Sequence, residues 1–215
     1  MHQKYIHIYI FDISPEMCWN ANVSLNTYIF GIFACVFAYL NNKLDIFNVL
    51  FIQTWMSMQL VEYFIWSKTF SNRLLSQIGF MLIVLQPVLG ILTVSNHMNI
   101  MKYVSLAGYA CFALITMVLN PWSKIDFSST PSSNGHLAWN WLKYSKPVML
   151  IWFLFLSIKF IANKNWILYI LLCISAAATY TLYHKTYTWG SLWCWLCNFA
   201  SFILVFNVFY DEVYV

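Results

Sequence analysis

Charged residues are scarce in this sequence, and their scarcity is the first constraint on the class of protein. Asp, Glu, Lys and Arg make up only 8% of the 215 residues, and hydrophobic residues make up 61%. A soluble domain carries roughly 25% charged residues. Because so few side chains can keep a surface wetted by water, most of the outside must meet lipid. The composition therefore predicts an integral membrane protein with the lipid bilayer as its main partner.

Runs of basic residues are also missing. The 11 basic residues, all Lys except Arg73, stand singly between apolar stretches. A nucleic-acid-binding protein needs a basic patch or stripe that follows the phosphate backbone. We therefore expect no nucleic acid among the partners. Single Lys residues at the ends of apolar runs are instead typical of membrane proteins, and Lys159 is expected to extend its ammonium group toward the bilayer surface.

The first segment, residues 1–22, leads into the first helix and lacks the marks of a removable signal peptide. Lys4, His7 and Asp12 interrupt its apolar character, and no small-residue cleavage site follows. Ser14-Pro15-Glu16 has the composition of a helix start, with a capping Ser, a Pro in the first turn and an acid near the positive end of the helix dipole.

Apolar runs account for most of the remaining chain. A helix needs about 17–25 residues to span the hydrocarbon core. The runs that approach this length are Val23–Leu40 (extended back toward Pro15), Leu44–Trp66, Leu74–Ser95, Ile100–Leu119, Val148–Ala162, Trp166–Tyr183 and Leu192–Tyr210. They predict an all-α, polytopic membrane protein, a bundle of about seven transmembrane helices in one domain over residues 23–215.

One connection is long and polar, residues 120–146. Its first part holds the turn-rich stretch 128–135, and its second part, His136–Trp141, is predicted to form a short aromatic helix in the membrane interface. With seven spans the termini lie on opposite sides. The N-terminal side holds seven basic residues, Lys4, Lys68, Arg73, Lys124, Lys143, Lys146 and Lys185, and the other side four, Lys43, Lys102, Lys159 and Lys164. This difference favours a cytoplasmic N-terminus.

The second predicted helix carries the most informative polar residue. Glu62 is the only acidic residue well inside any predicted span, and it shares a helix face with Trp55, Gln59 and Trp66, at spacings of four, three and four residues. A carboxylate in lipid is costly, so Glu62 should face the bundle interior, pair with a partner or be protonated. An interhelical hydrogen bond without further function remains the alternative.

The third predicted helix contains Gln86-Pro87. Pro87 removes a backbone donor and frees a carbonyl one turn earlier, while Gln86 can form a hydrogen bond to a neighbouring helix. Such a kink shapes a cavity or only fits the packing, and the packing interpretation is favoured.

The sixth and seventh predicted helices supply the other candidates. Tyr180 and His184 share a face near the end of one, and Asn198 lies about two turns inside the next. These ends lie on the same side as Glu62, so we predict a polar pocket that joins six residues: Gln59, Glu62, Gln86, Tyr180, His184 and Asn198. Five tryptophans would form its aromatic rim: Trp55, Trp66, Trp189, Trp193 and Trp195. Cys194 and Cys197 have redox or zinc-knuckle spacing, but no second pair completes a metal site, and we expect neither metal nor cofactor.

These residues favour or disfavour four functional classes. A protein that binds or translocates a small solute or proton around Glu62 fits best, although the absence of charged rings and filter-like Gly runs argues against a selective ion channel. A structural or assembly protein remains open. A membrane-embedded hydrolase needs several His or acid ligands at one depth, whereas His97, His136 and His184 are scattered. A retinal protein is excluded because the last predicted helix has no Lys.

Three motifs, Gln59-Leu60-Val61-Glu62-Tyr63-Phe64-Ile65-Trp66, Gln86-Pro87 and Gly190-Ser191-Leu192-Trp193-Cys194-Trp195, give the chain a resemblance to a known group. It resembles an uncharacterised family of small multi-spanning membrane proteins found in large DNA viruses and some protists. The resemblance covers the second to the seventh predicted helices. It implies no activity, but it implies that the Glu62 face and the start of the last helix form one shared site.

Overall fold

The computed structural model describes residues 20–94, 99–196 and 199–210, and these are predominantly helical, which confirms the predicted all-α class. The helices are α1 (Ala21–Leu40), α2 (Ile46–Ser67), α3 (Asn72–Leu92), α4 (Asn99–Leu119), α5 (Lys146–Ala162), α6 (Trp166–Tyr183), α7 (Trp189–Leu196) and α8 (Phe199–Phe209). A short hairpin, β1 (Ser129–Pro131) and β2 (Leu137–Trp139), lies in the connection between α4 and α5.

The helix bounds follow the sequence prediction closely. Helix α6 has the predicted range, and each end of the other helices lies within three residues of its predicted position. The predicted helix Leu192–Tyr210 corresponds to α7 and α8, which lie on either side of residues 197–198. Those two residues, and the helix-start signature at Ser14–Glu16, lie outside the described part of the chain.

Capping side chains explain where several helices begin. Asn20 accepts a hydrogen bond from the backbone N–H of Val23 at the start of α1, and Asp45 accepts one from Asn48 at the start of α2. Asn165 does the same for α6. Each cap satisfies a backbone donor that has no partner within the first helical turn.

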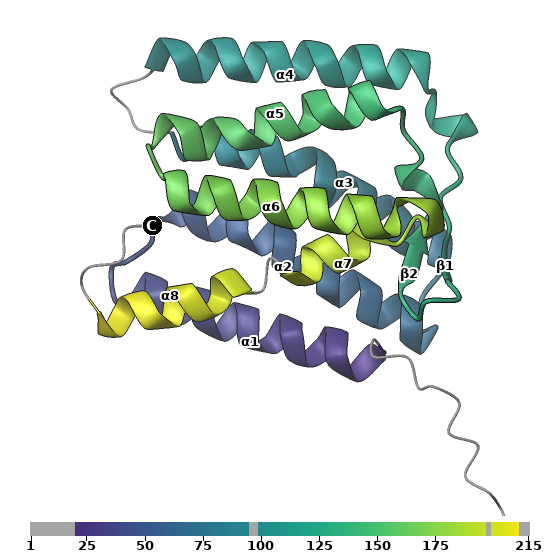
Figure 1. Cartoon of the computed structure of the whole chain (residues 1–215), viewed down its shortest axis with the longest axis horizontal. Coiled ribbons are helices and arrows are strands. Elements are labelled where there is room, and N and C mark those ends of the chain that lie inside the picture. The colour runs from purple at the N-terminus through teal and green to yellow at the C-terminus, as the bar shows by residue number, and fades with distance from the viewer. Residues whose placement is uncertain (1–19, 95–98, 197–198, 211–215) are drawn as a thin grey trace, which may run out of the picture.

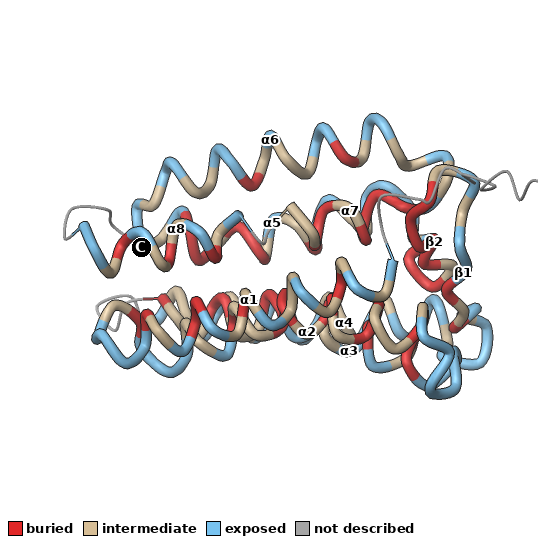
Figure 2. Tube along the Cα trace, turned by 90° about the horizontal axis from the view of Figure 1, so that it is seen from below, coloured by how far each residue is buried: buried red, intermediate tan, exposed pale blue. Residues whose placement is uncertain are grey.

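The helices lie along one axis in layers (Figures 1 and 2). Figure 2 shows α1–α4 in one layer, α5, α7 and α8 in the next, and α6 outermost. Helix α3 runs antiparallel to α2, as the contacts of Gly79 with Val61 and of Gly90 with Phe51 show. The other consecutive long helices also alternate in direction, so the chain passes repeatedly from one end of the bundle to the other (Figure 1).

Five helical segments are long and apolar enough to cross a membrane, by length and composition. They are Ala21–Leu40, Asn72–Leu92, Asn99–Leu119, Trp166–Thr186 and Trp189–Phe209. The last of them runs over residues 197–198. Helices α2 and α5 are not among these five segments. Helix α5 has only 17 residues, and α2 carries several polar side chains.

The hairpin closes one end of the bundle (Figure 1) and corrects one prediction. The stretch His136–Trp141, predicted as an interfacial helix, is instead strand β2 followed by the 3-10 turn η3 (Asn140–Leu142), and Trp139 and Trp141 are buried. The prediction was wrong because these aromatic rings pack onto helix glycines, which the local sequence does not reveal. Asn72 of α3 anchors the hairpin: its Nδ2 donates to Ser129 O at 2.7 Å, and its Oδ1 accepts from Ser129 N at 2.8 Å.

Pro87 lies within α3 and leaves the carbonyl of Ile83 without its helical partner. Trp152 of α5 supplies the replacement, with its indole Nε1 donating to Ile83 O at 3.1 Å. One residue further on, Tyr109 of α4 donates its hydroxyl to Val84 O at 2.7 Å. The carbonyl predicted to be freed by the proline thus accepts a hydrogen bond from a neighbouring helix, which favours the packing interpretation of Pro87.

A double-mutant cycle tests this bond. Trp152→Phe should lower the free energy of unfolding by about 1–3 kcal/mol, because it leaves the buried Ile83 carbonyl without a donor. In a Pro87→Ala background the new N–H can bond to Ile83 O, so the same substitution should cost about 1 kcal/mol less. Denaturant unfolding in detergent measures both. Equal costs in the two backgrounds would show that Trp152 acts only through its volume.

Candidate functional site

Glu62 lies in the last turns of α2, faces the interior and is 4% exposed. The hydroxyl of Ser191, in the first turn of α7, lies near its carboxyl group. The Oε1 atom of Glu62 is buried and has no hydrogen-bond partner within the described ranges. The Glu62 side chain therefore lies where α2 meets α7, with one carboxyl oxygen that has no partner.

Two glutamines lie in the same part of the bundle. Gln59 is one turn deeper on α2, Gln86 is on the adjacent α3, and both are fully buried. The contacts of Gly79 with Val61 and of Gly90 with Phe51 place Gln86 about one helical turn from Gln59 along the pair. Neither amide has a hydrogen-bond partner for its oxygen or its nitrogen within residues 20–94, 99–196 and 199–210. We call Gln59, Glu62 and Gln86 the polar cluster.

Tyr180 and His184 form a stacked pair at the end of α6. Their ring centroids are 5.2 Å apart, and His184 Nδ1 lies 3.0 Å from the backbone oxygen of Tyr180. Tyr180 meets Trp189 edge-on at 5.6 Å. Among the described residues no hydrogen bond joins this pair to the polar cluster.

The predicted rim divides into buried and partly exposed tryptophans. Trp189, Trp193 and Trp55 are buried and form a continuous row, with ring centroids 6.3 Å and then 5.1 Å apart. Trp66 and Trp195 are only half-buried. The buried row runs from the start of α7 to the middle of α2, and its three tryptophans belong to the hydrophobic core. Asn198 lies outside the described residues.

Two tryptophans of the hairpin region, Trp139 and Trp141, were absent from the predicted site and cover this end of the bundle. We call them the hairpin roof. Trp139 packs on Gly190, the neighbour of Ser191, and Trp141 packs on Gly79, which lies against Val61. The two indole rings are stacked at 4.9 Å. The hairpin therefore covers α7, which holds Ser191, and α3, which packs against the helix that holds Glu62. Sequence analysis missed it because nothing in the local pattern of residues 136–141 indicates the distant glycines.

His136 of the hairpin is buried beside the ring of Tyr183, at a centroid distance of 5.8 Å. Burial lowers the pKa of this imidazole below its ordinary value, because the charged form is poorly solvated there. The roof over the polar cluster therefore carries a neutral histidine at neutral pH.

Two further polar residues, Asn207 and Lys159, lie in the interior of the bundle, where the sequence did not predict them. Asn207 of α8 is 3% exposed, and neither atom of its amide has a partner among the described residues. Lys159, expected to reach the bilayer surface, instead turns inward, and its Nζ lies 2.6 Å from Asn48 Oδ1 of α2. An isolated polar residue in an apolar run was the available signal for both. No group of three or more His, Cys, Asp or Glu side chains gathers within the described residues.

No protein-family model matches the chain, and neither a curated protein nor a solved structure matches it. The resemblance to a viral and protist membrane-protein family therefore stays a prediction.

Two glycine substitutions test whether the hairpin roof is tightly seated. A Cβ at Gly190 would lie 2.8 Å from the Trp139 ring and 2.7 Å from Leu142, whereas one at Gly108 of α4 would meet only Phe155 at 3.6 Å. Gly190→Ala should therefore destabilise the protein by about 1–3 kcal/mol, and Gly108→Ala should be neutral or stabilise it by up to about 1 kcal/mol. Thermal unfolding compares them. Equal stability of the two variants would contradict a close-packed roof.

Proposed function

We propose that this protein is an integral membrane protein whose helices cross the bilayer seven times, with α7 and α8 forming the last pass. The five long apolar segments support this proposal. The outward faces of α4 and α6 support it further, because they expose large apolar side chains such as Ile100, Val118, Ile167 and Leu182. In water such surfaces would be an aggregation hazard, whereas in lipid they are the expected exterior. Helices α2 and α5 complete the seven.

Within this bundle, the polar cluster is proposed to bind a small polar solute or a proton. The observation that carries the proposal is the set of unpaired atoms: Oε1 of Glu62 and both amide atoms of Gln59 and of Gln86. Nearly all buried polar groups in proteins have a hydrogen-bond partner. Donors and acceptors concentrated on two adjacent helices are what a bound solute, or a water chain that carries protons, would satisfy.

The alternative is a structural or assembly protein in which the polar residues only join helices. The approach of Ser191 on α7 to Glu62 on α2 is of that kind and favours this alternative for one helix contact. A purely structural cluster would pair its amides with each other or with backbone groups, as Asn72 pairs with Ser129. The two glutamines have no such partners in the described chain, which favours the binding function. The hydrolase alternative draws no support from the described side chains.

The function is tested with Glu62→Gln, which keeps the size of the side chain and removes its acidity. Protein in liposomes with an internal pH-sensitive dye reports proton flux under a potassium diffusion potential, and a thermal-shift screen of small polar solutes reports binding. We expect Glu62→Gln to reduce the flux or the ligand-induced shift at least about tenfold, because a transported proton or bound solute needs this carboxyl group.

Asp126→Asn is the matched control, since it removes one acidic group from an exposed position in the α4–α5 connection. It should behave as the wild type in both assays. The proposal would be overturned if wild-type liposomes showed no flux above protein-free liposomes and no solute in the screen shifted the unfolding temperature in a Glu62-dependent way.

A further inference from the structure

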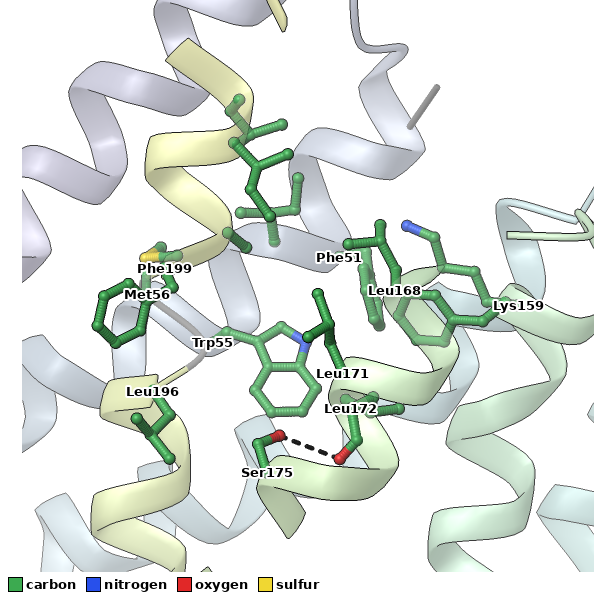
Figure 3. Close-up of a pocket in the computed structure, with 15 residues that line it drawn as sticks. Phe51, Trp55, Met56, Lys159, Leu168, Leu171, Leu172, Ser175, Leu196 and Phe199 are labelled. Carbon is green, nitrogen blue, oxygen red and sulfur yellow. Dashed lines mark hydrogen bonds between the residues drawn. The ribbon is translucent and has the colours of Figure 1, made fainter. Parts of the chain in front are cut away.

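A cavity lies between α2, α5, α6, α7 and α8, and no residue of the polar cluster lines it (Figure 3). Its volume is about 320 Å³, and its walls are almost entirely apolar, including Phe51, Trp55, Leu172 and Leu204. Leu171 of α6 and Phe199 of α8 also line it and are 50% and 54% exposed. The cavity therefore opens sideways between α6 and α8, on the surface that the proposed membrane location turns toward hydrocarbon.

Lys159 is the one charged residue among those that line this cavity. It lies in the last turn of α5, is 8% exposed, and holds its ammonium 4.2 Å from the centre of the Phe51 ring. Of its three N–H groups, one donates to Asn48 Oδ1 at 2.6 Å. This hydrogen bond goes to a neutral amide and not to a carboxylate. The cation therefore retains capacity for an anionic partner.

The position of Lys159 along the bundle matches the depth of a lipid head group. It lies about one turn from the end of α5, beside the first turn of α2, where a membrane-spanning helix leaves the hydrocarbon. From there the cavity extends along α6 from Leu168 to Ser175, about 10 Å at the rise of an α-helix. A positively charged group at the bilayer boundary, next to an apolar channel, matches a lipid whose head group lies at the boundary and whose acyl chain lies in the channel.

We propose that the cavity binds one acyl chain of an anionic phospholipid from the surrounding bilayer, with the lipid phosphate at Lys159. Moving a chain from bilayer hydrocarbon into an apolar cavity changes its surroundings little, so the chain alone gives no selectivity. Discrimination between lipids must come from the head group, through the single ammonium. One Lys near a membrane surface is worth about 1 kcal/mol toward an anionic lipid, which corresponds to about a fivefold preference.

Native mass spectrometry of the full chain in detergent measures this preference directly. Phosphatidylglycerol and phosphatidylcholine with identical acyl chains are added in competition. We expect about fivefold higher occupancy by phosphatidylglycerol on the wild type, and equal occupancy by both lipids on Lys159→Gln. Lys159→Arg, which keeps the charge, should retain the preference and shows whether a loss in the glutamine variant comes from the charge or from misfolding.

Two further variants and a second ligand sharpen the test. Lys164→Gln is the matched control, because it removes an exposed positive charge five residues away at the same end of the bundle. It should keep the wild-type preference. Ala200→Phe should lower the occupancy of both lipids, because Ala200 lines the cavity and the added ring fills it. Glu62→Gln should leave lipid binding unchanged, so failure of the proposed function and failure of this inference are distinguishable.

The proposal is overturned if Lys159→Gln keeps the preference for phosphatidylglycerol, if folded Lys159→Arg loses it, or if Ala200→Phe leaves lipid occupancy at the wild-type level. It is also overturned if oleate displaces phosphatidylglycerol at equal concentration. That result would identify a free fatty acid as the occupant.

Discussion

A polar group enclosed by apolar helices must find a partner inside the protein, and this constraint organises the whole bundle. The Ile83 carbonyl, which Pro87 deprives of its helical donor, accepts the indole N–H of Trp152. Asn72 satisfies both backbone groups of Ser129 and so fixes the hairpin. In each case a local defect in backbone bonding becomes a contact between elements far apart in the sequence.

The polar cluster does not follow this rule, and neither does Asn207 of α8. The Oε1 atom of Glu62 and the amides of Gln59, Gln86 and Asn207 have no hydrogen-bond partner in the described chain. Elsewhere the same fold meets the requirement with single well-placed side chains such as Asn72 and Trp152. The three unpaired residues on α2 and α3 are therefore the candidates for a bound solute or proton.

The helices were largely predictable because their signal is local. The apolar runs alone locate α1–α6 to within three residues, and the position of Pro87 predicts an unpaired carbonyl one turn earlier. The hairpin was not predictable, since Trp139 and Gly190 are far apart in the sequence and their contact depends on the final packing. The direction of a side chain could not be predicted either. Lys159 points inward to Asn48, but the periodicity of the sequence is the same whether its ammonium group points inward or toward the bilayer surface.

The proposed function requires that the polar cluster receive its missing partners from a water chain or a small solute. The decisive measurement is an experimental structure of the protein in lipid nanodiscs, at a resolution that shows ordered water. We expect density within hydrogen-bonding distance of Glu62 Oε1 and of the amides of Gln59 and Gln86. If those side chains instead bond directly to one another with no density between them, or if Glu62 points out of the bundle, the claim is contradicted.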